Sequence, residues 1–496
     1  RKIFYAVALA ALTLAFFSVS AAAQTATAAP PPPAAPRSPQ FPAPVERTLQ
    51  NGLRVVVVER RNVPLAAANL VVKTGGEADP RELAGLADMT ATLLTKGTKT
   101  RNAPQIVEQI ESLGGSISSG ARWDASEATV GVQSSRLAPA VEILADVVRN
   151  PIFESEEIER LRQQYMDDLQ VALSQPGALA RYVSSRVVFG DEPYGHPLSG
   201  TPESLPRIRR EDFIKFHQTY YRPDNAVLVV GGDVRAEEVF KLAEKFFGNW
   251  AKPAALLPAP KSASAARRAN AKPRVVVIDK PDAGQAAVLV ARLGIDRRDP
   301  NFFPGIVTNS VLSGYSGRLN QEIRIKRGLS YGAGSQLEVR RDVGPFSASA
   351  QTKNESGAEV ASLLLGEVAR LAAADVPEAE LVPRKAVIIG GFARDLETVG
   401  GLVSRVAALA VHGLSFDEIN RYINNVQSVT AADVRRFAGS RLAAEGTSVV
   451  VVGNAKEFLP ALRKQFPNVE VIPVAELDLN AAGLRRAAKP AAGATK

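Results

Sequence analysis

The chain has 496 residues, too many for one hydrophobic core, so two or more domains are expected. With 46% hydrophobic and 22% charged residues, it has the balance of an ordinary globular protein. It contains no cysteine, which excludes disulfides, thiolate metal sites and a cysteine nucleophile. The net charge is +9, but much of the excess lies in Pro- and Ala-rich segments, so no nucleic-acid partner is expected.

The beginning of the chain predicts export. Arg1 and Lys2 precede an apolar run, and small residues follow it at Ala21-Ala22-Ala23. This pattern is typical of a secretory signal peptide, here residues 1–23, with an uncleaved membrane anchor as the alternative. Residues 24–46 are rich in Pro and Ala and predict an extended tether. We therefore expect a periplasmic protein with no stable membrane insertion after signal cleavage.

Two larger blocks follow, an N-terminal domain at 47–251 and a C-terminal domain at 274–475. The segment between them, 252–273, is rich in Pro, Ala and Ser and is expected to be a linker. The basic tail at 476–496 is expected to be disordered.

The two blocks repeat one order of predicted elements. The matching segments are the helix starts at Glu211 and Ala432, the strands Val227–Val230 and Val449–Val452, the strands 128–133 and 346–351, and the helices 137–148 and 358–371. We therefore predict an α+β fold made of a duplicated unit. Each of the two homologous domains would be an antiparallel sheet with helices packed on it.

The residues alone indicate no enzyme class. A two-histidine metal clamp on one helix face needs i, i+4 spacing or close to it, whereas His196, His217 and His412 are scattered. The carboxylates between Glu154 and Asp168 lie on a predicted helix and fit its solvated face. A structural role is the simpler reading for each of these groups.

The segment Gly85–Ser118 resembles a region of the pitrilysin/insulinase family of zinc peptidases, written roughly G-L-A-H-F-L-E-H-M-L-F-K-G-T. The flanks Gly85-Leu86-Ala87 and Lys96-Gly97-Thr98 match without a gap. The family's His-x-x-Glu-His core then falls on Asp88, Ala91 and Thr92. Both metal-binding histidines and the general-base glutamate are therefore missing.

The family's third zinc ligand is a glutamate on a later helix, and its position falls on Asp168. A lone carboxylate cannot hold zinc, which takes about four N, S or O ligands. Asp88 and Asp168 could still meet and bind a hard cation, but an empty or water-filled vestige is favoured. No zinc is expected in this chain.

The segment Ser313–Ser335 resembles the family's G-G-x-x-S-R-L-x-x-x-L-R-x-x-x-G-L-x-Y, and the Arg-x6-Tyr pattern is intact as Arg324 and Tyr331. In the family this pair reaches across to the zinc half and helps hold the substrate backbone and the developing oxyanion. Without the family, a surface arginine and a packed tyrosine would be the simpler reading. The resemblance covers roughly residues 46–470 and implies two half-bowls that enclose the substrate.

These resemblances imply the non-catalytic subunit of a heterodimeric zinc metalloendopeptidase. It would contribute Arg324 and Tyr331 to a site completed by a homologous, zinc-bearing partner. Peptide substrates would add a strand to a sheet edge at Ser116, Ile117, Ser118 and Ser119. Two alternatives stay open: a peptide-binding or scaffold protein that has lost proteolysis, and a self-sufficient hydrolase with another metal site. The scattered histidines and the lack of cysteine disfavour the second alternative.

Overall fold

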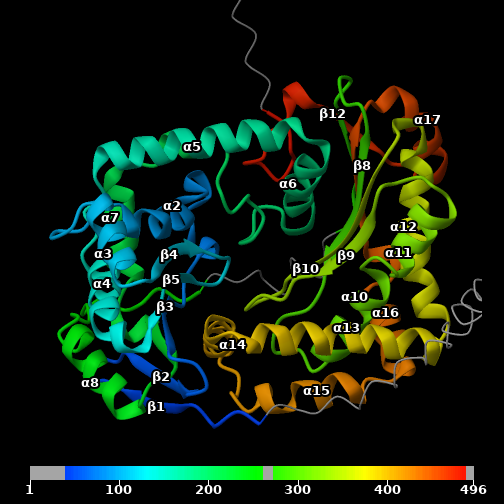
Figure 1. Ribbon diagram of the computed structural model, residues 1–496. Helices are drawn as coiled ribbons and strands as arrows, with labels where there is room; N and C mark the ends of the chain where they lie inside the picture. The colour runs from blue at the N-terminus through cyan, green and yellow to red at the C-terminus, as the bar shows by residue number, and fades with distance from the viewer. Residues whose placement is uncertain (1–39, 261–271, 487–496) are drawn as a thin grey trace, which may run out of the picture. The chain divides into compact units, whose positions relative to one another are not determined.

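The computed structural model describes residues 40–260 and 272–486, so the predicted signal peptide lies outside the described residues. These residues form two six-stranded sheets, one from each half of the chain (Figure 1). In spatial order, the first sheet contains β1 (Val45–Thr48), β2 (Arg54–Glu59), β6 (Ala226–Gly232), β3 (Leu65–Val72), β5 (Ser126–Gln133) and β4 (Ser116–Ala121). The second contains β12 (Glu470–Pro473), β7 (Val275–Asp279), β11 (Ser448–Gly453), β8 (Ala286–Leu293), β10 (Pro345–Thr352) and β9 (Ala333–Leu337).

The two sheets repeat one topology, which confirms the predicted duplication. The spatial order β2-β6-β3-β5-β4 corresponds to β7-β11-β8-β10-β9. The sheets are mixed, however, rather than wholly antiparallel as predicted. β2 pairs in parallel with β6, and β7 pairs in parallel with β11. These strands are far apart in sequence, and the long crossover between them brings the chain back in the same direction.

One face of the first sheet packs against helices of its own half. Val55 and Val57 of β2 share a core with Leu144 of α4 (Leu137–Arg149) and Phe213 of α7 (Arg210–Tyr220). These helices form because their apolar residues recur at helical spacing and make a continuous buried stripe. The helices of the first half are α2 (Leu86–Leu93), α3 (Ala103–Ser112), α4 (Leu137–Arg149), α5 (Ser155–Ser174), α6 (Pro176–Phe189), α7 (Arg210–Tyr220) and α8 (Ala236–Phe247).

The second half has a matching core, in which Val288 of β8 and Val451 of β11 pack with Leu364 and Phe437. Its helices are α10 (Phe302–Leu312), the short α11 (Arg318–Asn320), α12 (Gly357–Ala373), α13 (Glu378–Glu397), α14 (Val399–His412), α15 (Glu418–Ser428), α16 (Ala431–Arg441) and α17 (Ala455–Gln465). No helix in the described part of the chain is both long enough and apolar enough to cross a membrane.

The other face of the first sheet is covered by α14, a helix of the second half (Figure 1). Val56 and Val58 point to this face because side chains alternate along a strand, and they share a core with Val406 of α14. The approach is close at Gly231 of β6. A Cβ atom there would lie 2.8 Å from Cγ2 of Val403, so this contact requires glycine.

The second sheet is covered in the same way by α6, a helix of the first half. Leu179 and Val183 of α6 pack against Val276 of β7 and Leu289 of β8. The two helices are corresponding elements, because α6 follows the long helix α5 and α14 follows the long helix α13. The halves therefore exchange equivalent helices, and each sheet needs the other half to cover one of its faces.

Two segments predicted to lie outside the domains are packed where the structure describes them. In the predicted tether, Phe41 donates its N–H to Oδ1 of Asn420 (2.9 Å), and its carbonyl accepts from Nδ2 of the same residue (3.1 Å). In the predicted disordered tail, Leu479 and Leu484 are buried in the core around α6. Part of each segment is therefore in contact with the folded chain, through backbone hydrogen bonds at Phe41 and through buried leucines at Leu479 and Leu484.

Candidate functional site

The degenerate zinc-site positions lie on α2, whose N-terminus is anchored by a buried carboxylate. The backbone N–H groups of Gly85 and Ala87 each donate to Asp79 at 2.8 Å. Such an acceptor satisfies amide groups that the first helical turn cannot satisfy itself. Burial nevertheless raises the pKa of Asp79 well above its usual range, against the effect of these two hydrogen bonds.

Asp88 and Thr92 are joined through one phenol, that of Tyr165 on α5. The Tyr165 hydroxyl donates to Oδ2 of Asp88 at 3.1 Å and lies 3.1 Å from Oγ1 of Thr92. Because its single proton goes to the carboxylate, Thr92 must be the donor of the second bond. The backbone N–H of Ala121 also donates to Oδ1 of Asp88 (3.4 Å). Burial raises the pKa of Asp88, while the bonds from Tyr165 and Ala121 lower it.

These residues do not fit a zinc ion. Ala91 offers no donor atom, and both carboxylate oxygens of Asp88 already accept hydrogen bonds. Asp168 is exposed on α5. Across residues 40–260 and 272–486, no three His, Cys, Asp or Glu side chains are grouped so that they could hold a metal ion. A hydrogen-bonded cluster of Asp88, Tyr165 and Thr92 stands where the family has its metal ligands.

The predicted substrate strand, Ser116 to Ser119, belongs to β4 at the edge of the first sheet. β4 pairs with β5 on one side only, so its other side presents backbone groups that an added strand could bind. Ser118 and Ser119 line a large cavity. A peptide-binding role for this strand stays a prediction.

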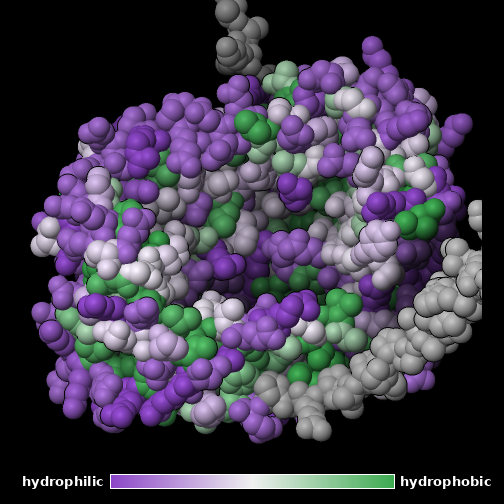
Figure 2. All heavy atoms as spheres, in the orientation of Figure 1, coloured by the Kyte–Doolittle hydropathy of each residue, from purple (hydrophilic) through white to green (hydrophobic). Residues whose placement is uncertain are grey.

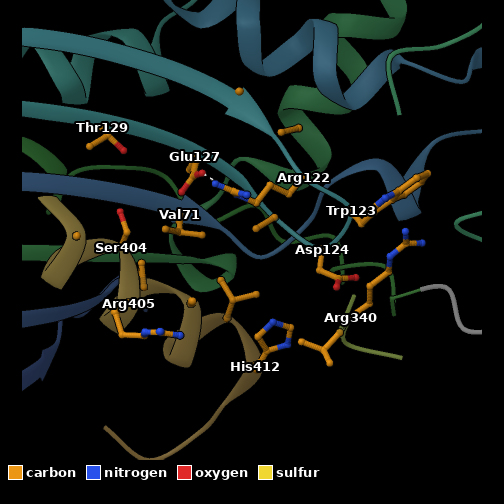
Figure 3. Close-up of a pocket in the computed structure, with 18 of the residues that line it drawn as sticks. Val71, Arg122, Trp123, Asp124, Glu127, Thr129, Arg340, Ser404, Arg405 and His412 are labelled. Carbon is orange, nitrogen blue, oxygen red and sulfur yellow. Dashed lines mark hydrogen bonds and ion pairs between the residues drawn. The ribbon is translucent and has the colours of Figure 1, made fainter. Parts of the chain in front are cut away.

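This cavity has a volume of about 1340 Å³ and is lined by both halves of the chain. In Figure 3, Glu127 and Thr129 of β5 lie on one side, and Ser404, Arg405 and His412 of α14 lie on the other. Figure 2 shows that the drawn face is hollowed and that both hydrophilic and hydrophobic residues border the hollow. Burial lowers the pKa of His412 to about 4, so this histidine is neutral at pH 7.

Arg324 and Tyr331 lie in a different environment. Arg324 belongs to a π-helical turn, Gln321–Lys326, and its guanidinium lies 5.4 Å from the ring centroid of Tyr315. Tyr331 lies in the loop before β9 and is 93% exposed. The reading as a packed tyrosine is therefore wrong, because this side chain has almost no packing.

The structure does not bring the two sets of predicted residues into one cavity. The large cavity includes neither Arg324 nor Tyr331 among its lining residues. Tyr331 instead lines a smaller cavity of about 270 Å³ with Arg181 of α6 and Gln351 of β10. Asp88, Ala91, Thr92 and Asp168 line neither of these two cavities, so the pair and the degenerate zinc positions share neither of them.

Sequence reasoning missed Tyr165 and Tyr315, which complete the two sites. Tyr165 precedes Asp168 by three residues on a predicted helix, a spacing that places both on one face. That spacing was the available signal. Tyr315 carried no such signal, because its contact with Arg324 depends on how the loop folds back over the π-helical turn.

Two arginines between β9 and β10 were also missed. Arg340 is buried, and its guanidinium lies 4.6 Å from the ring centroid of Trp123 and 4.7 Å from that of Tyr194. Figure 3 shows the Arg340 side chain beside Trp123. Arg341 pairs with Glu77 of the first half at 3.1 Å. These contacts attach the tip of a hairpin in the second half to the first half.

The chain matches two family models. The model described as insulinase, peptidase family M16, matches residues 54–202, and the model described as the peptidase M16 inactive domain matches residues 207–386. An uncharacterized zinc protease of Mycobacterium leprae is 29% identical over 418 residues, which cover 83% of this chain and 93% of that protein. Another, from Rickettsia bellii, is 28% identical over 422 residues, which cover 82% and 97%.

Two solved structures share the fold. The peptidase M16 inactive domain from Pseudomonas fluorescens matches with a TM-score of 0.76 and 24% identity, covering 83% of this chain and 98% of that one. A protease from Helicobacter pylori matches with a TM-score of 0.77 and 21% identity, covering 84% and 100%.

A duplicated α+β unit with two matching mixed sheets is therefore the fold of insulinase-type peptidases, and α2 carries substitutions at the positions of the family's metal ligands. The chain is a member of the insulinase family, peptidase family M16, and it lacks the family's catalytic His-x-x-Glu-His motif.

Proposed function

We propose that this chain is the zinc-free subunit of a heterodimeric metalloendopeptidase. It contributes Arg324 and Tyr331 to a site that a zinc-bearing homologous partner completes. The observation that carries the proposal is the contrast between its two sites. The zinc positions hold an internal hydrogen-bonded cluster, whereas Tyr331 is exposed on an ordered loop.

An exposed tyrosine alone would carry little weight, but the loop around Tyr331 is fixed by side chains. Thr352 of β10 donates from Oγ1 to the carbonyl of Leu329 at 2.6 Å. Ser330 donates from Oγ to the carbonyl of Gly332 (2.7 Å) and accepts from the Gly332 N–H (3.1 Å). The fold thus holds the backbone on both sides of a side chain that it does not pack, as expected for a residue that meets another molecule.

The chemistry of the pair fits peptide hydrolysis. The Tyr331 phenol can donate a hydrogen bond to a substrate carbonyl and to the oxyanion that forms from it. Arg324 supplies a charged anchor for the substrate backbone. The zinc-activated water would come from the partner, because residues 40–260 and 272–486 of this chain contain no group of side chains that could hold the metal. Substrates would be peptides in extended form, bound along a sheet edge such as β4, and the complex would work in the periplasm.

A second candidate is a peptide-binding or scaffold protein without proteolysis. It is favoured by the large cavity, which is lined by the edge strand β4 and does not involve Arg324 or Tyr331. In that case peptides would bind to the first half, and the pair would have no function.

The test is to isolate the tagged chain from its native host and to identify what co-elutes. We expect a homologue that carries His-x-x-Glu-His, close to one zinc ion per complex, and peptidase activity that a chelator abolishes. The chain alone should show neither zinc nor activity. Co-elution with peptides only, without a zinc-bearing homologue, would favour the scaffold function instead.

A further inference from the structure

The loops around Arg324 and Tyr331 are connected by one buried amide. Asn320, the last residue of α11, is 3% exposed. Its Nδ2 donates to the carbonyl of Tyr315 at 2.6 Å, and its Oδ1 accepts from the N–H of Ala333 at 3.4 Å. We propose that Asn320 is a positioning residue that fixes Arg324 and Tyr331 relative to each other, and this inference rests on the proposed function.

The first bond of Asn320 acts on Arg324 through Tyr315. The Tyr315 ring is 71% exposed, yet the Arg324 guanidinium lies 5.4 Å from its centroid. An aromatic face attracts a cation and restricts where it can move. Because Asn320 holds the backbone of Tyr315, it also holds the surface against which Arg324 lies.

The second bond acts on Tyr331. Ala333 begins the edge strand β9, two residues after Tyr331, and pairs with β10 on one side. Asn320 accepts from the N–H on the free side of the strand. The preceding loop contains Gly328 (φ +65°) and Gly332, whose backbones are less restricted than those of other residues. The bond at Ala333 therefore adds to those from Thr352 and Ser330 in limiting the conformations of this loop.

Asn354 provides a matched control in the same half. It is 6% exposed, donates from Nδ2 to the carbonyl of Ala283 at 2.9 Å, and accepts on Oδ1 from the N–H of Asn454 at 2.9 Å. Asn320→Ala and Asn354→Ala thus each remove one donated and one accepted bond from a buried asparagine. Both variants should lower the stability of the chain. Only Asn320→Ala should also change the positions of Arg324 and Tyr331.

The first measurement is hydrogen exchange on the isolated chain, which requires no partner. Asn320→Ala should speed amide exchange at least tenfold in residues 313–317 and 327–335, because both loops lose a tie. Asn354→Ala should leave exchange in these segments unchanged. The two variants should lower the melting temperature of the chain by similar amounts. Unchanged exchange in Asn320→Ala would overturn the inference, whatever Arg324 and Tyr331 do.

The second measurement is steady-state kinetics on the complex isolated with each tagged variant. Asn320→Ala should lower kcat/KM by roughly 10- to 100-fold, as expected when a reacting group is displaced by about 1 Å. In a Tyr331→Phe background the same change should cost less, because Asn320 acts partly through Tyr331. Tyr315→Phe keeps the ring and should resemble wild type, whereas Tyr315→Ala should resemble Asn320→Ala.

The outcomes separate this inference from the proposed function. If Tyr331→Phe turns over like wild type, the composite site is wrong and Asn320 has nothing to position. If Tyr331→Phe lowers turnover but Asn320→Ala behaves like Asn354→Ala, the composite site stands and the role of Asn320 is only structural.

Discussion

Arg341 and Glu77, which belong to different halves of the chain, form an ion pair in which Nη1 of the partly buried Arg341 lies 3.1 Å from Oε1 of the buried Glu77. Arg341 also donates from Nη2 to the carbonyls of Lys73 (2.8 Å) and Asp124 (2.6 Å). Its own backbone N–H donates to Oδ2 of Asp124 at 2.8 Å. The guanidinium is thus held by backbone as well as by charge, and this contact fastens one half to the other.

Glu77 should make stability depend on pH. Burial raises the pKa of Glu77 from 4.5 to about 7, although Arg341 opposes the shift. Between these values the unfolded chain has lost the proton that the folded chain still holds, so the free energy of unfolding falls as pH rises from 4.5 to 7. Relative to Glu77→Gln, wild type should lose on the order of 2 kcal/mol across this range.

The measurement is urea unfolding of both proteins at several pH values. Every other titrating group is common to the two chains, so the difference isolates Glu77. Arg341→Ala should raise the pKa of Glu77 further, because it removes the cation that favours the charged form. Parallel pH curves for wild type and Glu77→Gln would mean that Glu77 titrates normally.

Restoring the zinc site should need more than its three lost residues. Asp88→His, Ala91→Glu and Thr92→His together should give at most weak zinc binding. The third ligand position holds Asp168, one methylene shorter than the family's glutamate, and ligand distances are close to 2 Å. Adding Asp168→Glu should tighten binding, as measured by metal analysis after dialysis. Tight binding by the triple variant alone would show that Asp168 is an adequate ligand.

Tyr331→Phe should lower turnover of the complex without affecting its assembly. The substitution removes only a hydroxyl, and the side chain is almost fully exposed, so folding should not change. Losing one donor to an oxyanion costs on the order of 10²–10³ in kcat. Arg324→Ala should also raise KM, because it removes the charged anchor. Kinetics on the complex, with gel filtration to confirm assembly, provide the test.

Gly231 should tolerate no side chain, whereas Gly131 on the same sheet should. A Cβ at Gly231 would meet Val403 of α14 at 2.8 Å, and a Cβ at Gly131 would meet nothing within 4 Å. Gly231→Ala should therefore destabilise the protein by about 1–3 kcal/mol, the usual cost of overpacking. Gly131→Ala should lie within about 0.5 kcal/mol of wild type. Equal unfolding midpoints for Gly231→Ala and Gly131→Ala in denaturant would contradict the close approach of α14 to β6.

The sequence predicted the repeated unit because each copy carries strong local signals. The apolar segments around Val229 and Val451 predict buried strands, and the periodic segment around Leu144 predicts an amphipathic helix. The structure has these same elements at these positions. It did not predict that α14 would cover the first sheet. An amphipathic helix shows that it has a partner but not which sheet the partner belongs to, and the exchange depends on contacts far apart in the sequence.

The candidate site also has one feature that the sequence predicts and others that depend on the fold. The loss of the metal ligands at Asp88, Ala91 and Thr92 was readable from the gapless flanks. The hydrogen bond from the Tyr165 hydroxyl to Asp88 could not be predicted from the sequence, because Tyr165 lies on another helix and contacts Asp88 only in the folded chain. The ion pair of Arg341 could not be predicted either, because its partner Glu77 lies in the other half of the chain.

The exchange of α6 and α14 also governs the order in which this protein can fold. When the ribosome has completed the first half, the apolar face of α6 has no sheet to cover, because β7, β8 and β11 are not yet synthesised. The face of β6 that α14 covers is open for the same period. Domains usually fold as units from the N-terminus during synthesis, and exposed apolar surface promotes aggregation. The first half therefore cannot bury these apolar surfaces until α14 and the strands of the second sheet have been synthesised.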